Sequence, residues 1–297
     1  MNTRVGCWML YLSWRRICMT DKRGPILKLN QVCKTYDLKG QQSVQALQNI
    51  NLALYPGECL GIVGQSGSGK SSLAKCVTQL EQVTSGEIWY RQQEITRLKG
   101  EKLRQMRKQI QMVFQEPAAI FNPRMKVGRF ICEPLLNYKM MKREQAVQEM
   151  LVLLERVGLS AADADKYPHE LSGGQQQRAV IARAIGLRPD VILYDEATSA
   201  LDVSIQQQIL DLLIELRRET GGSSIFISHD LAVVQQVSDR IAVMHEGKVV
   251  EIVDSSKLTS SANHGYTRGL MSSALSLRAL RDSRQMQERI EVLAGSR

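Results

Sequence analysis

The chain has 297 residues, of which 43% are hydrophobic and 23% are charged, a balance typical of a globular protein with a substantial core. No apolar stretch approaches the ~20 residues that a membrane-spanning helix needs, so we expect any membrane-spanning part to come from a partner. The formal net charge is +9, but much of the positive excess lies in residues 1–24 and 276–297. A basic stripe on the folded body, which nucleic-acid binding would favour, is therefore not predicted.

Residues 1–24 form an expected N-terminal extension with several arginines around a short apolar run, Cys7–Leu12. The run is too short to span a membrane and lacks a clear signal-peptide cleavage site. Three alternatives stay open: a plain solvated tail, a segment that contacts anionic lipid, and a natural start at Met19 that excludes residues 1–18.

The six cysteines form no CxxC pair, and the four histidines are dispersed along the chain. Cys59 and Cys76 lie in apolar sequence on either side of a glycine-rich loop. We expect reduced, buried cysteines, as in a cytosolic protein, and no cysteine or histidine metal cluster.

The first predicted elements are an alternating run from Ile26, a second run at Val44–Leu54, and the continuous apolar strand Cys59–Val63. Pro56-Gly57 predicts a turn before that strand. A small antiparallel β region thus leads into a buried strand. A helix is expected to start inside the following glycine loop and to run over Ser71–Gln79.

Residues 96–108 are polar and basic, and Ile110–Phe114 reads as a short strand. Apolar residues then recur at helical spacing from Ala146 to Val157, and Gly158 suits the end of that helix. We therefore expect residues 116–171 to be mostly helical and inserted between core strands.

Val191–Tyr194 is a continuous apolar run, typical of a strand covered on both faces. An amphipathic helix from Ile205 to Leu216 is predicted to stop at Gly221-Gly222, and Ser224–Ser228 and Ile241–Met244 are further strands. Strands that alternate with helices predict an α/β fold with a mostly parallel sheet.

A phosphate-binding loop of the form GxxxxGK[ST] follows the strand Cys59–Val63. Glycines let backbone N–H groups curl around phosphates, and a helix N-terminus adds a positive dipole end. Lys70 is expected to bridge the β- and γ-phosphates, and Ser71 to ligate Mg²⁺. The predicted nucleotide-binding residues here are Gly64, Gln65, Ser66, Gly67, Ser68, Gly69, Lys70, Ser71 and Ser72.

Two carboxylates end the apolar run that begins at Val191. Asp195 is placed to hold Mg²⁺, and Glu196 is placed to orient or polarise an attacking water, because phosphoryl transfer depends mainly on positioning and charge. Downstream of a phosphate loop, this pair predicts nucleotide hydrolysis.

The segment Leu171-Ser172-Gly173-Gly174-Gln175 resembles the signature of ABC-transporter ATPase subunits. Ser172, Gly173 and Gly174 open a helix and expose N–H groups that can bind a phosphate. In that family, ATP lies between two subunits, so the resemblance implies that Ser172, Gly173, Gly174 and Gln175 contact ATP held by the opposing subunit.

The same resemblance assigns further residues of this chain. Gln115 resembles the glutamine that senses the γ-phosphate and contacts the permease, and it joins Ser71 and Asp195 as a Mg²⁺ ligand. His229 resembles the histidine that steadies the γ-phosphate and the catalytic water. Asp202 resembles a residue of the loop at the dimer interface, and Tyr36 resembles the aromatic that stacks on adenine. Catalysis is thus assigned to Glu196, His229, Gln115 and Lys70.

The resemblance covers about residues 25–275 and implies a P-loop NTPase (RecA-like) core, an N-terminal antiparallel β subdomain and an inserted helical subdomain. The expected domain is 25–260, with the helical part at about 116–171 and a C-terminal tail at 261–297. Phe121–Gly128, Tyr167–Glu170 and His264–Arg268 are similar to the dipeptide, oligopeptide and nickel importer ATPases, particularly their second ATPase subunit. Glu116 and Gly265 depart from that pattern, where Asp and Pro are usual.

The resemblance therefore implies an ATP- and Mg²⁺-dependent subunit at the cytoplasmic face of the plasma membrane, which powers uptake of a peptide or a chelated metal. The implied partners are a paralogous ATPase subunit, two permease subunits and an extracytoplasmic substrate-binding protein, with no nucleic acid. Two alternatives stay open, an exporter ATPase and a non-transport ABC protein that acts on ribosomes or DNA. The cargo is not identified by these residues.

Overall fold

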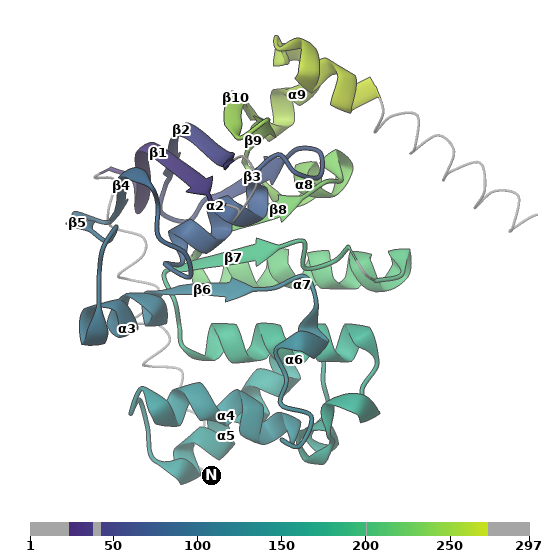
Figure 1. Ribbon diagram of the computed structural model, residues 1–297. Helices are drawn as coiled ribbons and strands as arrows, with labels where there is room; N and C mark the ends of the chain where they lie inside the picture. Colours follow the sequence, from purple (N-terminus) through teal and green to yellow (C-terminus); the bar gives the residue numbers. More distant parts are fainter. Residues whose placement is uncertain (1–23, 38–42, 200, 273–297) are drawn as a thin grey trace, which may run out of the picture.

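The computed structural model describes residues 24–37, 43–199 and 201–272 (Figure 1). The expectations for residues 1–23, and for the part of the tail after residue 272, lie outside the described residues. Within those residues, no helix combines the length and apolarity needed to span a bilayer.

An antiparallel sheet of four strands forms the N-terminal β region. Its strand order is β2 (Val44–Leu54), β1 (Leu27–Tyr36), β4 (Ser85–Tyr90) and β5 (Gln93–Glu94). The side chains of Leu27 and Leu29 are buried while Lys28 between them is exposed, so the alternation in the sequence gives one face of β1 to the core.

The central sheet has six strands. Its order is β10 (Lys248–Asp254), β9 (Arg240–His245), β3 (Cys59–Val63), β8 (Ser223–Ser228), β7 (Val191–Asp195) and β6 (Ile110–Val113). β10 pairs antiparallel with β9, and the other neighbouring pairs are parallel. All residues of β3 and β8 are buried, as expected for strands covered on both faces.

Successive residues of β3 point into two different cores. Leu60 and Ile62 pack beneath the antiparallel sheet, together with Leu73 of α2 (Lys70–Val77). Cys59 and Val63 face the opposite side. That second core is formed with α6 (Gly173–Gly186), α7 (Val203–Thr220) and α8 (Leu231–Val237). The phosphate-loop strand is therefore fixed from both sides.

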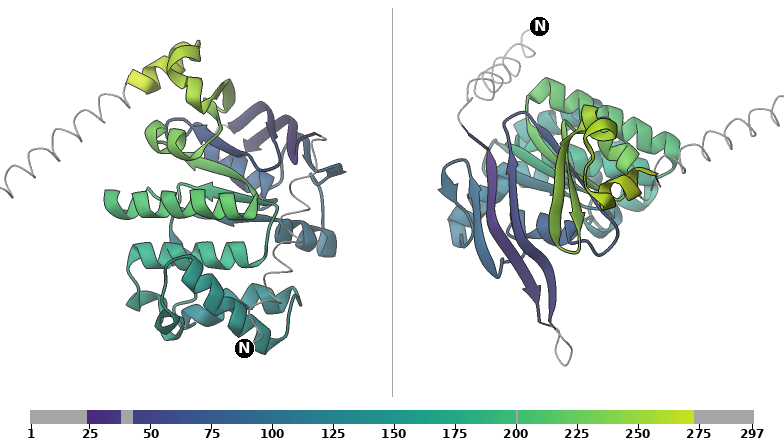
Figure 2. Two further views of the ribbon diagram at one scale, coloured as in Figure 1. Left: turned by 180° about the vertical axis from the view of Figure 1, so that it is seen from behind. Right: turned by 90° about the horizontal axis from the view of Figure 1, so that it is seen from above.

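The helical layer is the segment that follows β6 and precedes α6 in the chain. It contains α4 (Val127–Asn137) and α5 (Arg143–Arg156). Both helices pack against α6, which separates them from α7 and the sheet (Figures 1 and 2). The remaining turns of this segment are short 3₁₀ helices: η1 (Pro117–Ala119), η2 (Ala161–Asp165) and η3 (Pro168–Glu170). The predicted α/β architecture with a helical insertion is confirmed.

Some boundaries differ from the sequence-based expectation. The predicted helix over Ser71–Gln79 begins at Lys70 and ends at Val77, because the chain turns out of the helix and Gln79 has a positive φ of 55°. The predicted strand ends at Val113 rather than Phe114.

The structure also adds elements that the sequence patterns did not predict. Residues 96–108 were described only as polar and basic, yet α3 (Gly100–Gln109) is a regular helix. β4, β5 and β10 were missed. After β10 come η4 (Ser255–Lys257) and α9 (Leu258–Ser261), and residues 265–272 are helical and lie at the top of Figure 1 in yellow.

Candidate nucleotide-binding site

The predicted phosphate loop joins the carboxyl end of β3 to the first turn of α2. A Cβ atom at Gly64 would lie 2.2 Å from the carbonyl oxygen of Met244. At Gly69, φ is +100° and a Cβ would lie 2.4 Å from the carbonyl oxygen of Ala46. Only glycine fits these two positions, so close packing against β9 and β2 sets the curve of the loop.

Lys70 is buried, with 4% of its surface exposed. Its amine donates hydrogen bonds to the carbonyl oxygens of Gly64 at 2.7 Å and Gln65 at 2.9 Å. Burial lowers the pKa of this amine, while the nearby carboxylates of Glu196 and Asp195 act in the opposite direction. The amine is therefore held against the loop backbone, close to two negative charges.

Ser71 and Asp195 bring two oxygen atoms together beside the loop. The Ser71 hydroxyl donates to Asp195 Oδ1 at 3.3 Å. Asp195 is 7% exposed, and burial raises its pKa, opposed by the hydrogen bond from Ser71 and reinforced by the charge of Glu196. A hydroxyl oxygen and a carboxylate oxygen on one side of a phosphate loop are suitable ligands for Mg²⁺, which binds oxygen atoms and retains several waters.

Gln115 follows β6, and its side-chain amide donates to Ser199 Oγ at 3.4 Å. The Ser199 hydroxyl donates in turn to the carbonyl oxygen of Glu196 at 2.9 Å. Gln115 is thus linked to Glu196 through Ser199 by its amide nitrogen, and its side-chain carbonyl oxygen is the atom that would bind a cation. Its predicted part in holding Mg²⁺ stays a prediction.

Glu196 and His229 meet at the carboxyl ends of β7 and β8. His229 Nδ1 lies 3.4 Å from Glu196 Oε2. Glu196 has a positive φ of 48°, and its backbone N–H donates to the carbonyl oxygen of Ile227 at 3.0 Å. A non-glycine residue in this region is strained, and strain of this kind clusters at functional sites. The pair is suited to hold and polarise a water molecule.

Tyr36 lies beside the start of α2. Its hydroxyl donates to Glu81 and lies 3.3 Å from the Ser72 hydroxyl. Lys34 Nζ lies 4.7 Å from the centre of the Tyr36 ring. Burial, together with the hydrogen bond to Glu81, raises the pKa of the Tyr36 hydroxyl. The ring is therefore positioned by contacts that the sequence motifs did not indicate.

The signature segment opens α6 through a reciprocal cap. The Ser172 hydroxyl accepts from the Gln175 N–H at 3.3 Å, and the Gln175 side chain accepts from the Ser172 N–H at 3.0 Å. A Cβ at Gly174 would lie 2.6 Å from Ile205 Cγ2, so α6 packs closely on the first turn of α7. Asp202 immediately precedes α7, and its carbonyl accepts from Gln206 N.

The predicted site residues therefore fall into two groups. Lys70, Ser71, Asp195, Glu196 and His229 converge at the carboxyl ends of parallel strands, the usual ligand edge of an open α/β sheet. Ser172, Gly173, Gly174 and Gln175 begin a helix that lies beyond α7 and β7 as seen from α2 (Figures 1 and 2).

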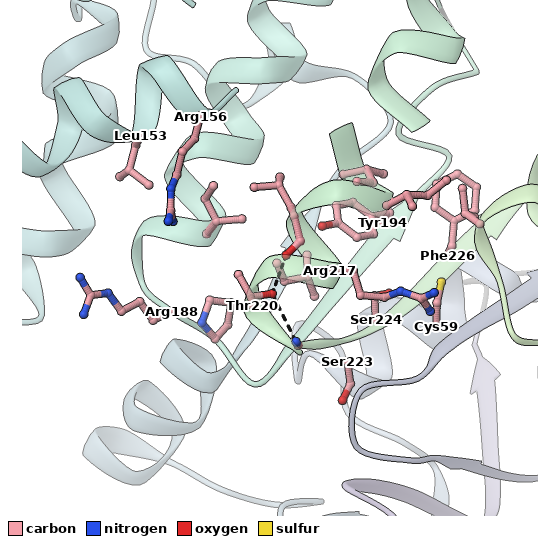
Figure 3. Close-up of a pocket in the computed structure, with 18 of the residues that line it drawn as sticks. Cys59, Leu153, Arg156, Arg188, Tyr194, Arg217, Thr220, Ser223, Ser224 and Phe226 are labelled. Carbon is pink, nitrogen blue, oxygen red and sulfur yellow. Dashed lines mark hydrogen bonds between the residues drawn. The ribbon is translucent and has the colours of Figure 1, made fainter. Parts of the chain in front are cut away.

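A separate cavity of about 60 Å³ lies at the opposite, amino ends of the strands (Figure 3). Cys59, Leu153, Tyr194 and Phe226 are among its lining residues. Its arginines are paired with acids, including Arg217 with Asp239. None of the predicted nucleotide-binding residues lines this cavity, so it is distinct from the candidate site.

Two contacts of the site escaped the sequence interpretation. Glu81 holds Tyr36, and the hydroxyl of Tyr266 accepts from the Gln65 N–H at 3.1 Å. The His264–Arg268 segment was singled out only as a family motif, and nothing in its residue types indicated contact with a loop 201 positions earlier.

Comparisons with known proteins found similar sequences and similar folds. A family model described as ABC transporter matches residues 47–199. The chain is 44% identical over 254 residues to the glutathione import ATP-binding protein GsiA of Pectobacterium atrosepticum, covering 84% of this chain and 41% of that protein. It is 42% identical over 258 residues to the oligopeptide transport ATP-binding protein OppF of Streptococcus mutans, covering 86% of this chain and 83% of that protein.

Among solved structures, the dimeric post-hydrolysis state of the ATP-binding cassette MJ0796, bound to ADP and Pi, has a TM-score of 0.71 and 33% identity. That match covers 77% of this chain and 98% of the other. CbiO1 from Clostridium perfringens, part of the ABC transporter complex cbiONQ, has a TM-score of 0.72 and 26% identity, covering 89% and 100%. The chain spans about 41% of the length of the GsiA relatives it matches.

Proposed function

Because this chain belongs to the ABC transporter family of ATP-binding proteins, we propose that it binds ATP with Mg²⁺ and hydrolyses it to drive import of a peptide or a related solute. The observation that carries the proposal is the convergence of Lys70, Ser71, Asp195, Glu196 and His229 beside one glycine-rich loop. Phosphoryl transfer needs positioning and charge more than covalent chemistry, and these residues supply both.

Each residue of this group has a definite task in the proposal. Lys70 exchanges its backbone carbonyl partners for the β- and γ-phosphate oxygens. Ser71 and Asp195 hold Mg²⁺, which neutralises charge on the phosphates. Glu196 polarises the attacking water, and His229 holds it and the γ-phosphate in line. Tyr36 provides an aromatic surface beside the loop for the adenine ring.

The second group of residues acts on a different nucleotide. Ser172, Gly173 and Gly174 present the N–H groups of the first turn of α6, where the helix dipole favours an anion. In the proposal these groups, with Gln175 and Asp202, contact ATP bound by a second subunit. The separation of α6 from α2 by α7 and β7 supports this division, because one copy then contributes half of each of two sites (Figure 1).

The proposed assembly contains this chain, a paralogous ATPase, two permease subunits and an extracytoplasmic substrate-binding protein. This chain would lie at the cytoplasmic face of the plasma membrane. Support comes from the relatives named for glutathione import and oligopeptide transport. The charge distribution of the chain gives no reason to add a nucleic-acid partner.

The test is ATP hydrolysis and uptake by the reconstituted complex. We expect Mg²⁺-dependent phosphate release and peptide uptake with the wild-type chain, and loss of both with Lys70→Ala. Lys102→Ala, an exposed lysine on α3, is the control and should retain both activities. Hydrolysis that persists undiminished in Lys70→Ala would refute the assignment of the site. Hydrolysis without import, with export instead, would refute the transport direction.

A further inference from the structure

The C-terminal segment (residues 262–272) reaches back to the phosphate loop through one side chain. The hydroxyl of Tyr266 accepts a hydrogen bond from the backbone N–H of Gln65 at 3.1 Å. Gln65 is the first residue after Gly64, and its own side chain is exposed. The loop is therefore connected to a part of the chain that follows the last strand of the sheet.

Tyr266 is itself held in place by a ring contact. Its ring stacks on that of His245, with centroids 3.9 Å apart and an interplanar angle of 24°. His245 ends β9 and directly follows Met244, whose carbonyl oxygen packs against Gly64. Both contacts of Tyr266 thus converge on the same edge of the loop.

The backbone around Tyr266 is anchored to β10. Glu251 accepts hydrogen bonds from the N–H groups of Asn263 at 2.7 Å and His264 at 3.2 Å. Thr267 is fully buried. A tyrosine between such fixed neighbours loses little additional side-chain entropy when its hydroxyl contacts the loop. The segment is therefore suited to hold the loop rather than merely to touch it.

The peptide groups at Gln65 are held from two directions. Tyr266 accepts from the N–H, while the Lys70 amine donates to the carbonyl oxygen at 2.9 Å. Under the proposed function, Lys70 leaves this carbonyl to reach the phosphates. The carbonyl oxygen then keeps the Ser68 N–H as a donor at 3.2 Å, a contact within the loop, while the hydrogen bond to Tyr266 still ties the Gln65 N–H to the C-terminal segment.

We propose that Tyr266 is a positioning residue that holds Gln65 of the phosphate loop in the conformation that nucleotide binding requires. Through this contact, the C-terminal segment contributes to nucleotide affinity. The proposal rests on the proposed function for its effect on ATP, but not for the contact itself. Tyr266 does not touch the reacting atoms, so its removal should weaken binding more than it slows the chemical step.

The test compares Tyr266→Phe with wild type in the full-length chain. The phenylalanine keeps the stacked ring and removes only the hydroxyl. Without nucleotide, we expect the Gln65 amide to exchange hydrogen about two- to tenfold faster, as the loss of one hydrogen bond implies. In the assembled complex, we expect the KM for ATP to rise with kcat nearly unchanged, and Tyr266→Ala to raise KM further.

Tyr167→Phe is the matched control. The Tyr167 ring also stacks on a histidine, but Tyr167 is the N-cap residue of η3 and not part of the C-terminal segment. This variant should match wild type in both measurements.

The two readouts separate the inference from the proposed function. Unchanged amide exchange in Tyr266→Phe would overturn the inference, whatever the ATPase activity. Faster exchange with an unchanged KM would overturn the link to nucleotide. A wild-type complex that neither binds nor hydrolyses ATP would refute the proposed function and the predicted KM effect together, while exchange at Gln65 would still decide whether Tyr266 holds the loop.

Discussion

The imidazole Nδ1 of His229 lies 3.4 Å from Glu196 Oε2, which joins the carboxyl ends of β8 and β7 at the edge that the phosphate loop also occupies. Glu196 reaches this position with a positive φ, and a backbone hydrogen bond to Ile227 holds it there. Fixing two polar side chains before substrate arrives is what electrostatic catalysis requires.

Glu196→Gln should remove hydrolysis and retain nucleotide binding. The amide is nearly isosteric but cannot polarise a water molecule, so we expect the ATPase rate to fall by about 10²–10⁴-fold. Nucleotide affinity, measured with a fluorescent ATP analogue, should stay within a few-fold. Glu215→Gln, at an exposed position of α7, is the matched control and should behave as wild type.

Glu196 and His229 should act as one unit. Since the two side chains are in contact, we expect His229→Ala to lower the rate strongly, and the double variant with Glu196→Gln to be little worse than the worse single variant. A double-mutant cycle on the ATPase rate measures this. Fully multiplicative effects would mean that the contact plays no part in turnover.

Asp195→Asn should stabilise the nucleotide-free chain at neutral pH. Burial raises the pKa of Asp195 in the folded state, so its ionised form opposes folding. That penalty is full above the folded-state pKa, shrinks as the pH falls through it, and is gone below the lower pKa of the unfolded chain. The melting temperature of Asp195→Asn should therefore exceed that of wild type at pH 7, with a difference that narrows on acidification. A gap that is absent at pH 7, or that widens in acid, would contradict the burial argument.

Two neighbouring glycines of the signature should respond differently to a methyl group. At Gly174 the added Cβ meets Ile205 at 2.6 Å, whereas at Gly173 it meets Leu201 at 3.7 Å. Gly174→Ala should cost about 1–3 kcal/mol of stability through overpacking, and Gly173→Ala much less. Thermal melting of the two variants measures the difference, and equal melting temperatures would show that α6 shifts freely against α7.

Arg124→Glu should uncouple transport from hydrolysis. Arg124 is exposed, and its N–H is fixed by the Asn122 side chain in the turn before α4. We expect the helical layer that begins here, with Gln115 at its entrance, to receive a helix of the permease. We expect uptake to fall more than basal ATPase activity, with Arg218→Glu, at an exposed position of α7 outside the helical layer, as the control. Equal losses of uptake and ATPase activity would argue against this position as the coupling surface.

The sequence predicted those parts of the fold whose burial pattern is strong. β2 and β3 have the predicted limits, and α7 ends where Gly221 adopts a left-handed conformation. α3 was missed because only Met106 of its ten residues is buried, so it has almost no apolar periodicity. β4 was missed for a similar reason, since Ile88 is the one buried residue among its six and the strand shows no alternating burial.

The candidate site shows the same division. The loop and the two carboxylates follow from local motifs, because their spacing is fixed within one strand and one turn. The contacts of Glu81 with Tyr36 and of Tyr266 with Gln65 join residues that are 45 and 201 positions apart. Such contacts depend on how β1, α2 and the C-terminal segment pack, and no single-segment pattern contains that information.

The shared-site arrangement is tested most directly by the structure of the assembled complex with the Glu196→Gln chain and ATP–Mg²⁺. We predict ATP held by Lys70 and Ser71 of this chain on one side and by the signature segment of the second ATPase subunit on the other, with Ser172 facing the nucleotide of that second subunit. ATP enclosed by the phosphate loop and the signature segment of one and the same chain, or a phosphate loop that binds no nucleotide, would contradict the account.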